Sequence, residues 1–182
     1  MPMPRKQRRW VFALLLCLPL AALALGGDFT LTDHDGQPWS LRQARGKVVL
    51  IQFGYTHCPD ICPLNLAHTA AVLRALGKDA DRVQALFISV DPQRDTPARL
   101  KQFVHYFSPR ILGLTGNIAQ LEKMTHAYGA YFSYPDGTIG DDYLVEHSGS
   151  LYVVDPDGDF DSFMPRSLPV VRVVGEVRDL IE

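Results

Sequence analysis

The feature that most constrains this chain is an apolar run that leads directly into two closely spaced cysteines. Residues 47–53 (KVVLIQF) are nearly all apolar, and residues 54–63 (GYTHCPDICP) follow without a break. A continuous apolar run of this length predicts a strand buried on both faces of a sheet. Residues 64–76 carry apolar side chains at helical spacing and end at Gly77, which predicts a helix. The cysteines are therefore expected where a buried strand turns into a helix.

Cys58 and Cys62 stand four residues apart, a spacing that places both sulfur atoms on one helix face. The positive end of the helix dipole favours a thiolate, which binds soft metal ions or attacks disulfides. Pro63 lacks a backbone N–H and fits a first helical turn, so Cys58 is expected in the loop and Cys62 at the helix entrance. A purely structural disulfide is the alternative, but three intervening residues constrain the unfolded chain very little.

Residues 1–27 have the composition of a targeting segment, separate from a folded domain at residues 28–182. Four basic residues precede sixteen uncharged ones at 10–25, which would span about 24 Å as a helix against the roughly 30 Å of a bilayer core. A cleaved signal and a retained membrane anchor are both open. The domain is expected either at a bacterial inner membrane, facing the periplasm, or free in the periplasm. Cys17 lies in this segment, so the domain has only two cysteines.

The charge of the chain is divided unequally. Four basic residues and no acidic ones lie before residue 28, whereas residues 28–182 carry 14 basic and 20 acidic side chains, a net charge of −6 with histidines neutral. A nucleic-acid-binding domain needs a basic face. We therefore expect no nucleic-acid partner.

The order of the predicted elements indicates an α/β domain. In sequence they are a hairpin at 28–41, a strand at 47–53, a helix at 64–76, a strand at 83–90, a helix at 97–107, a strand at 111–114, a helix at 117–128, an extended excursion or hairpin at 131–145, a hairpin at 149–163 and a helix at 168–181. Alternating strands and helices make parallel pairs, whereas the terminal hairpin adds antiparallel strands. We expect a thioredoxin-like fold with a mixed central sheet flanked by helices.

The cysteine spacing and a distal histidine separate this chain from the usual redox enzymes of that fold. Thioredoxin-type oxidoreductases place two residues between their cysteines and a cis-proline against them, but here three residues intervene and the matching loop, residues 146–148 (EHS), has no proline. His147 in that loop would add a nitrogen ligand to the two thiols. Two thiolates and one imidazole suit Cu(I), and a thiolate and imidazole set also holds Cu(II). Structural zinc would need a fourth protein ligand, and none stands out.

Three stretches, in the same order, resemble the signatures of the Sco (SenC) copper metallochaperones: residues 54–63 (GYTHCPDICP), 89–97 (SVDPQRDTP) and 147–158 (HSGSLYVVDPDG). The resemblance covers residues 26–165. It implies a membrane-tethered thioredoxin-like domain that binds copper through Cys58, Cys62 and His147. It also implies a role in assembling the binuclear copper site of cytochrome c oxidase subunit II, with an upstream copper donor. The chain departs from the family at Glu146, where an aspartate is common, and in a very short spacer after the N-terminal segment.

The same cysteines allow an alternative function, a thiol-disulfide oxidoreductase that reduces the cysteines of a copper-site protein. Copper loads only onto a reduced pair, so the two functions are compatible. The two functions differ in their need for His147: copper binding requires this ligand, whereas a dithiol reductant does not. Copper delivery requires no catalytic turnover, so enzymatic activity is expected only in the alternative. A peroxiredoxin-like peroxidase is disfavoured, because the cysteines lie too close for a peroxidatic and resolving pair.

The other histidines are expected to stay outside the metal site. His57 adjoins Cys58, but its side chain is expected to point away from the sulfur. The remaining four lie on predicted turns or helices and are expected to be solvated or packed: His34, His68, His105 and His126.

The loop after the second buried strand is expected to border the metal, because neighbouring parallel strands end at the same edge of a sheet. Asp95 or Thr96 should cap the following helix. Asp91, Arg94 and Asp95 are expected to orient the cysteine loop or the acceptor protein without ligating metal. On this view Asp91→Ala leaves Cu(I) affinity nearly unchanged and impairs transfer to the acceptor.

Overall fold

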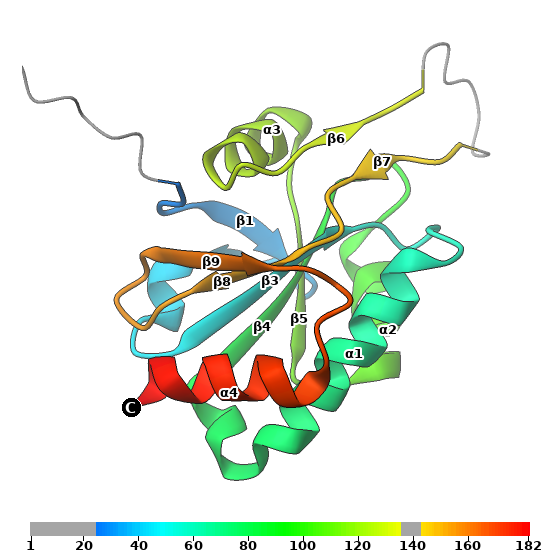
Figure 1. Ribbon diagram of the computed structural model, residues 1–182. Helices are drawn as coiled ribbons and strands as arrows, with labels where there is room; N and C mark the ends of the chain where they lie inside the picture. Colours follow the sequence, from blue (N-terminus) through cyan, green and yellow to red (C-terminus); the bar gives the residue numbers. More distant parts are fainter. Residues whose placement is uncertain (1–24, 136–142) are drawn as a thin grey trace, which may run out of the picture.

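Strand β3 (Val48–Gly54) lies inside a seven-stranded sheet, and all seven of its residues are buried. The computed structural model describes residues 25–135 and 143–182, shown in Figure 1. The strand order is β2-β1-β5-β4-β3-β8-β9, with β3, β4 and β5 parallel to one another and the outer strands antiparallel to their neighbours. The expected mixed sheet and thioredoxin-like arrangement are confirmed. The other strands and the helices are β1 (Thr30–Asp33), β2 (Pro38–Ser40), α1 (Ile61–Leu76), β4 (Val83–Ser89), α2 (Pro97–Phe107), β5 (Ile111–Thr115), α3 (Ile118–Ala127), β6 (Phe132–Ser133), β7 (Glu146–His147), β8 (Leu151–Val154), β9 (Phe160–Met164) and α4 (Val170–Ile181), with short 3-10 helices at Leu41–Ala44 and Gly77–Arg82.

Alternate residues of β3 enter two separate hydrophobic cores, one on each face of the sheet. Val48 and Leu50 pack in the core covered by α1, α2 and α4. Val49 and Ile51 pack in the core covered by α3 and by the segment around the β6–β7 hairpin. Figure 1 shows these helices on their two faces. Burial of both faces explains why this strand has no alternation of polar and apolar residues.

The two loops that carry the sequence signatures leave the sheet at one edge. The parallel register of β3 and β4 places Gly54 opposite Ser89, and the backbone N–H of Val90 donates to the carbonyl of Gly54 at 2.8 Å. The cysteine loop and the loop at residues 89–97 therefore begin side by side, as expected for parallel strands.

Several element boundaries differ from the sequence predictions. Helix α1 begins at Ile61, three residues before the predicted start, because Pro63 sits in its first turn, where a missing N–H costs nothing. His147 belongs to the short strand β7, paired with Phe132 of β6, and not to a loop. Helix α4 begins at Val170, two residues later than predicted.

The N-terminal end of the described chain is attached to the domain. The N–H of Gly26 donates to the carbonyl of Ala127 at 2.7 Å, and the hydroxyl of Tyr128 donates to the carbonyl of Gly27 at 3.0 Å. The predicted targeting segment lies outside the described residues, apart from its last three positions. Among residues 25–135 and 143–182, no helix has the length and the apolar character needed to cross a membrane.

Candidate metal centre

The two cysteines lie at the junction of the loop and helix α1, as the sequence predicts. Cys62 is the second residue of α1 and is 1% exposed, whereas Cys58 is half-buried in the preceding loop. The backbone N–H of Cys62 donates to the sulfur of Cys58 at 3.4 Å. Cys58 and Cys62 are both free, with no disulfide between them. Gly54 makes this approach possible, since a Cβ at position 54 would lie 2.6 Å from the sulfur of Cys62.

His147 reaches the thiol pair from a strand 85 residues further along the chain. Its Nε2 atom lies 3.4 Å from the sulfur of Cys62. Its Nδ1 atom lies 3.1 Å from the carbonyl oxygen of Ser148, which accepts a hydrogen bond when Nδ1 is protonated and thereby leaves the Nε2 lone pair facing the sulfur. The ligand atoms of Cys58, Cys62 and His147 all lie within 4.8 Å of one another. The structure thus brings together all three predicted ligands.

Asn65 holds the His147 segment against α1 and is itself held by the sheet. The side-chain amide of Asn65 donates to the carbonyl of Gly149 at 3.3 Å, and the side chain of Gln52 in β3 donates to the carbonyl of Asn65 at 3.2 Å. Across the β6–β7 hairpin, Ser148 and Tyr131 exchange two hydrogen bonds of 3.0 Å. The helix, the sheet and the hairpin therefore all limit the position of His147.

The two thiols have opposite acidities. The hydrogen bond from the thiol of Cys62, together with bonds from the backbone N–H groups of Asp60 and Cys62, lowers the pKa of Cys58 to about 3 despite its partial burial. The pKa of Cys62 is raised, first because it shares its proton with the sulfur of Cys58 and then because it is buried. At neutral pH the metal-free pair therefore holds one proton, on Cys62, and one negative charge, on Cys58. A thiolate of this kind is both a soft metal ligand and a nucleophile.

In the reduced, metal-free protein we expect iodoacetamide to modify Cys58 at about pH 5, where an ordinary thiol of pKa about 8.5 is almost fully protonated and unreactive. The pKa of about 3 keeps Cys58 as a thiolate above that pH, and its reactivity is lost as the pH falls through that value. Peptide-resolved mass spectrometry measures the labelling. Cys62→Ala is the matched control, since it removes the largest cause of the shift and should abolish labelling at that pH. Equal labelling of Cys58 and Cys62 would contradict the assignment.

A second group of metal-ligating side chains lies close by, but its oxygen atoms are already engaged. His57, Asp91 and Asp95 bring their ligand atoms within 4.8 Å of one another. Asp91 accepts hydrogen bonds from Arg94 at 2.5 Å and from the hydroxyl of Tyr143 at 2.7 Å, one on each oxygen. The buried Arg94 cation already balances the carboxylate charge. We therefore assign this group a structural role.

Asp95 ties the cysteine loop to the loop after β4. Its two oxygens accept bonds from the backbone N–H and the hydroxyl of Thr56 and from the hydroxyl of Ser89, at 2.5 to 2.8 Å. Thr96, not Asp95, caps helix α2, with its side chain accepting from the N–H of Arg99. The ring of His57 lies on the same side, with Nδ1 3.8 Å from Asp95. The expected orientation of His57, away from the sulfur of Cys58, agrees with this placement.

Three residues that position the site were not singled out from the sequence: Tyr55, Asn65 and Tyr143. Tyr55 lies within the cysteine-containing stretch at residues 54–63, so its position in the sequence could have indicated a role in the site. Asn65 and Tyr143 act through contacts with segments remote in sequence, and no local pattern marks them.

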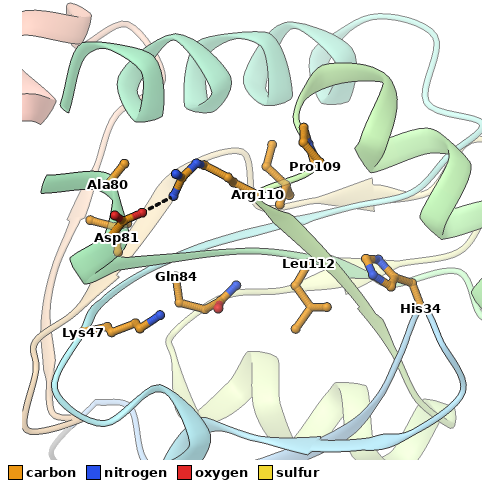
Figure 2. A pocket seen from close by; sticks show the side chains of 10 residues that line it. His34, Lys47, Ala80, Asp81, Gln84, Pro109, Arg110 and Leu112 are labelled. Carbon is orange, nitrogen blue, oxygen red and sulfur yellow. Dashed lines mark hydrogen bonds and ion pairs between the residues drawn. The ribbon is translucent and has the colours of Figure 1, made fainter. Parts of the chain in front are cut away.

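A separate pocket lies at the opposite edge of the sheet, where β3, β4 and β5 begin. It is therefore far from the cysteines and His147. Figure 2 shows it between His34, Lys47, Gln84 and Arg110. Arg110 is paired with Asp81 at 2.8 Å, and Nδ1 of His34 accepts a bond from the N–H of Gly113. The pocket is separate from the candidate metal centre, whose own groove is lined by Cys58, Tyr131, Leu144 and His147 among others.

The fold is a thioredoxin-like domain, and the three converging ligand atoms form a candidate metal centre of two thiols and one imidazole. Comparison with known proteins identifies its relatives. A sequence model of the SCO1/SenC family matches residues 19–182, and the chain belongs to this family. The mouse mitochondrial protein SCO2 homolog is 42% identical over 154 residues, which is 84% of this chain and 60% of that protein. The chain thus spans less than two thirds of the length of such curated relatives.

Solved structures agree with this family assignment. Bradyrhizobium japonicum ScoI, solved with copper bound, is 41% identical and superposes with a TM-score of 0.79, covering 86% of this chain and 99% of that one. BsSco, a member of the Sco family of cytochrome c oxidase assembly proteins, was solved in work that identified a disulfide switch. It is 26% identical with a TM-score of 0.70, covering 87% of this chain and 95% of that one.

Proposed function

We propose that this protein is a copper metallochaperone that holds one copper ion through Cys58, Cys62 and His147. The observation that carries the proposal is the convergence of two sulfur atoms and one imidazole nitrogen within 4.8 Å. Soft thiolate ligands favour Cu(I), and a ligand set of two sulfurs and one nitrogen leaves structural zinc without its fourth protein ligand. The copper bound by B. japonicum ScoI supports the choice of metal.

The acceptor that we propose is the binuclear copper site of cytochrome c oxidase subunit II, which the protein loads or prepares. The description of BsSco as belonging to a family of cytochrome c oxidase assembly proteins supports this acceptor. An upstream donor would supply the copper. The basic and apolar N-terminal segment supports a location at a bacterial inner membrane with the domain facing the periplasm, or in the periplasm if the segment is a cleaved signal.

X-ray absorption of the reduced full-length protein loaded with Cu(I) tests the metal site directly. We expect one copper per chain, with two sulfur neighbours and one nitrogen neighbour. The sulfur distances report the thiolates of Cys58 and Cys62, and the nitrogen shell reports His147. A copper shell of sulfur alone, or copper bound equally well after both cysteines are alkylated, would overturn the assignment.

The low pKa of Cys58 favours a second candidate function, the reduction of a disulfide in a copper-site protein. In this reaction the Cys58 thiolate attacks one sulfur of the partner disulfide, and the other sulfur leaves as a thiolate. Cys62 then gives its proton to this first partner thiolate and attacks the sulfur of Cys58, so that the second partner sulfur leaves as a thiolate; protonation of that sulfur by water completes the partner dithiol. Two electrons move to the partner, and Cys58 and Cys62 are left as a disulfide. His147→Ala separates the functions, because it should spare this exchange and impair copper binding.

A further inference from the structure

Arg94 is a buried cation at the point where three site-forming segments meet. Its side chain is 6% exposed, and its Nε donates to the carboxylate of Asp91, which is fully buried, at 2.5 Å. A buried charge requires a partner and further contacts to offset the loss of hydration. The surroundings of Arg94 supply both.

The ion pair of Arg94 and Asp91 contacts Tyr143 at three groups of the tyrosine: its ring, its backbone carbonyl and its hydroxyl. The guanidinium carbon of Arg94 lies 3.5 Å from the centroid of the Tyr143 ring, in a stacked arrangement. Nη1 of Arg94 donates a hydrogen bond to the backbone carbonyl of Tyr143 at 2.9 Å. The hydroxyl of Tyr143 donates to Asp91 at 2.7 Å. Because ring, carbonyl and hydroxyl are all engaged, the chain is fixed four residues before His147.

Tyr55 extends the contact to His147 itself. The guanidinium carbon of Arg94 lies 5.5 Å from the centroid of the Tyr55 ring. The hydroxyl of Tyr55 accepts the backbone N–H of Val145 at 3.2 Å. The Tyr55 and His147 rings meet edge to face, with centroids 5.7 Å apart. Tyr55 also stands three residues before Cys58, so it joins the loop of the thiols to the strand of the imidazole.

We propose that Arg94 is a positioning residue, which holds His147 at bonding distance from the thiol pair through Tyr143 and Tyr55. The inference rests on the proposed copper site. Metal ligands must be held within about 0.5 Å of their productive positions, and outer-shell contacts supply that restraint. A lysine cannot replace the planar guanidinium, which stacks on an aromatic ring and donates along fixed directions.

A double-mutant cycle in the full-length protein distinguishes positioning from general stabilisation. Cu(I) affinity is measured by competition with a chromogenic chelator for wild type, Arg94→Met, His147→Ala and the double variant. We expect Arg94→Met to weaken Cu(I) binding about 10- to 100-fold, the range typical of outer-shell partners of metal ligands. In the His147→Ala background the same change should weaken binding less than about 2-fold, since the ligand through which Arg94 acts is gone. Equal weakening in both backgrounds would overturn the proposal.

A measurement without copper tests the role of Arg94 independently of the proposed copper site. In wild type, the Tyr55 ring should shift the NMR resonances of the His147 ring protons, and Arg94→Met should remove that shift. Arg110→Met is the matched control, because Arg110 forms an exposed pair with Asp81. If wild type takes up no copper, the proposed function fails while the NMR comparison still decides the role of Arg94. Should Arg94→Met not fold, Arg94→Lys keeps the charge beside Asp91 and is expected to lose the same ring shift; retention of that shift would count against the proposal.

Discussion

His147→Ala is expected to weaken Cu(I) binding by more than about 100-fold and to leave the fold intact. Even outer-shell partners of metal ligands are typically worth 10- to 100-fold in affinity, and His147 is proposed as a direct ligand. The substitution retains the backbone pairing of β7 with β6. The side chain is only partly buried, so its loss opens no large core cavity. Competition between the reduced protein and a chromogenic Cu(I) chelator, under anaerobic conditions, measures the effect.

Two other histidines provide matched controls for this measurement. His126 lies exposed on α3, and His57 lies next to Cys58 but faces Asp95. His126→Ala and His57→Ala should each change Cu(I) affinity by less than about 3-fold, because neither imidazole is placed with the sulfur atoms. If His57→Ala weakened binding as much as His147→Ala, the third ligand would be misassigned.

Asp91→Ala is expected to lower the free energy of unfolding by about 3 to 5 kcal/mol, the cost of removing one member of a buried ion pair. The side chains of Asp91 and Arg94 are 0% and 6% exposed, so the arginine would be left as a buried charge without this partner. The hydroxyl of Tyr143 would also lose its acceptor. Urea denaturation followed by circular dichroism measures the change.

Asp81→Ala is the control for this second experiment. Asp81 also pairs with an arginine, at 2.8 Å, but the side chains of Asp81 and Arg110 are 73% and 53% exposed. An exposed pair contributes about 0 to 1 kcal/mol, so the control should barely change the urea midpoint. A loss in Asp91→Ala no larger than in Asp81→Ala would show that the buried pair does not support the fold.

The burial of Asp91 changes what its substitution is expected to do. From the sequence, Asp91→Ala was expected to leave Cu(I) affinity nearly unchanged and to impair transfer, because Asp91 was expected to orient the cysteine loop or the acceptor without ligating metal. Asp91 instead supports Arg94 from within the domain, and Arg94 contacts the segment that leads to His147. The substitution should therefore act first on stability and then on the geometry of the metal centre.

Local patterns in the sequence were sufficient for most of the fold, because strands and helices are specified by spacing along the chain. The apolar run of β3 and the proline in the first turn of α1 each reflect the backbone conformation of their own segment. These patterns also placed Cys58 in a loop and Cys62 in a helix. Boundaries were less certain, as the early start of α1 shows, since several residues tolerate both a loop and a first helical turn.

The tertiary structure alone decided how the site is held together. Asp91, Arg94 and Asp95 occupy one short loop, yet Asp95 binds Thr56 while Asp91 and Arg94 bind Tyr143. No spacing along the chain predicts that division, because it depends on which strand ends lie side by side.

The same holds for the chemistry of the ligands. The sequence by itself determined that two thiols share a strand-to-helix turn, and it pointed to His147 as the third ligand through the predicted place of residues 146–148 in the fold and through the family resemblance. The unequal acidity of Cys58 and Cys62 depends on which sulfur is buried and which one accepts hydrogen bonds. The approach of His147 to Cys62 depends on contacts across 85 residues. Such contacts are set by strand order and register, which bring together residues that have no relation in the linear sequence.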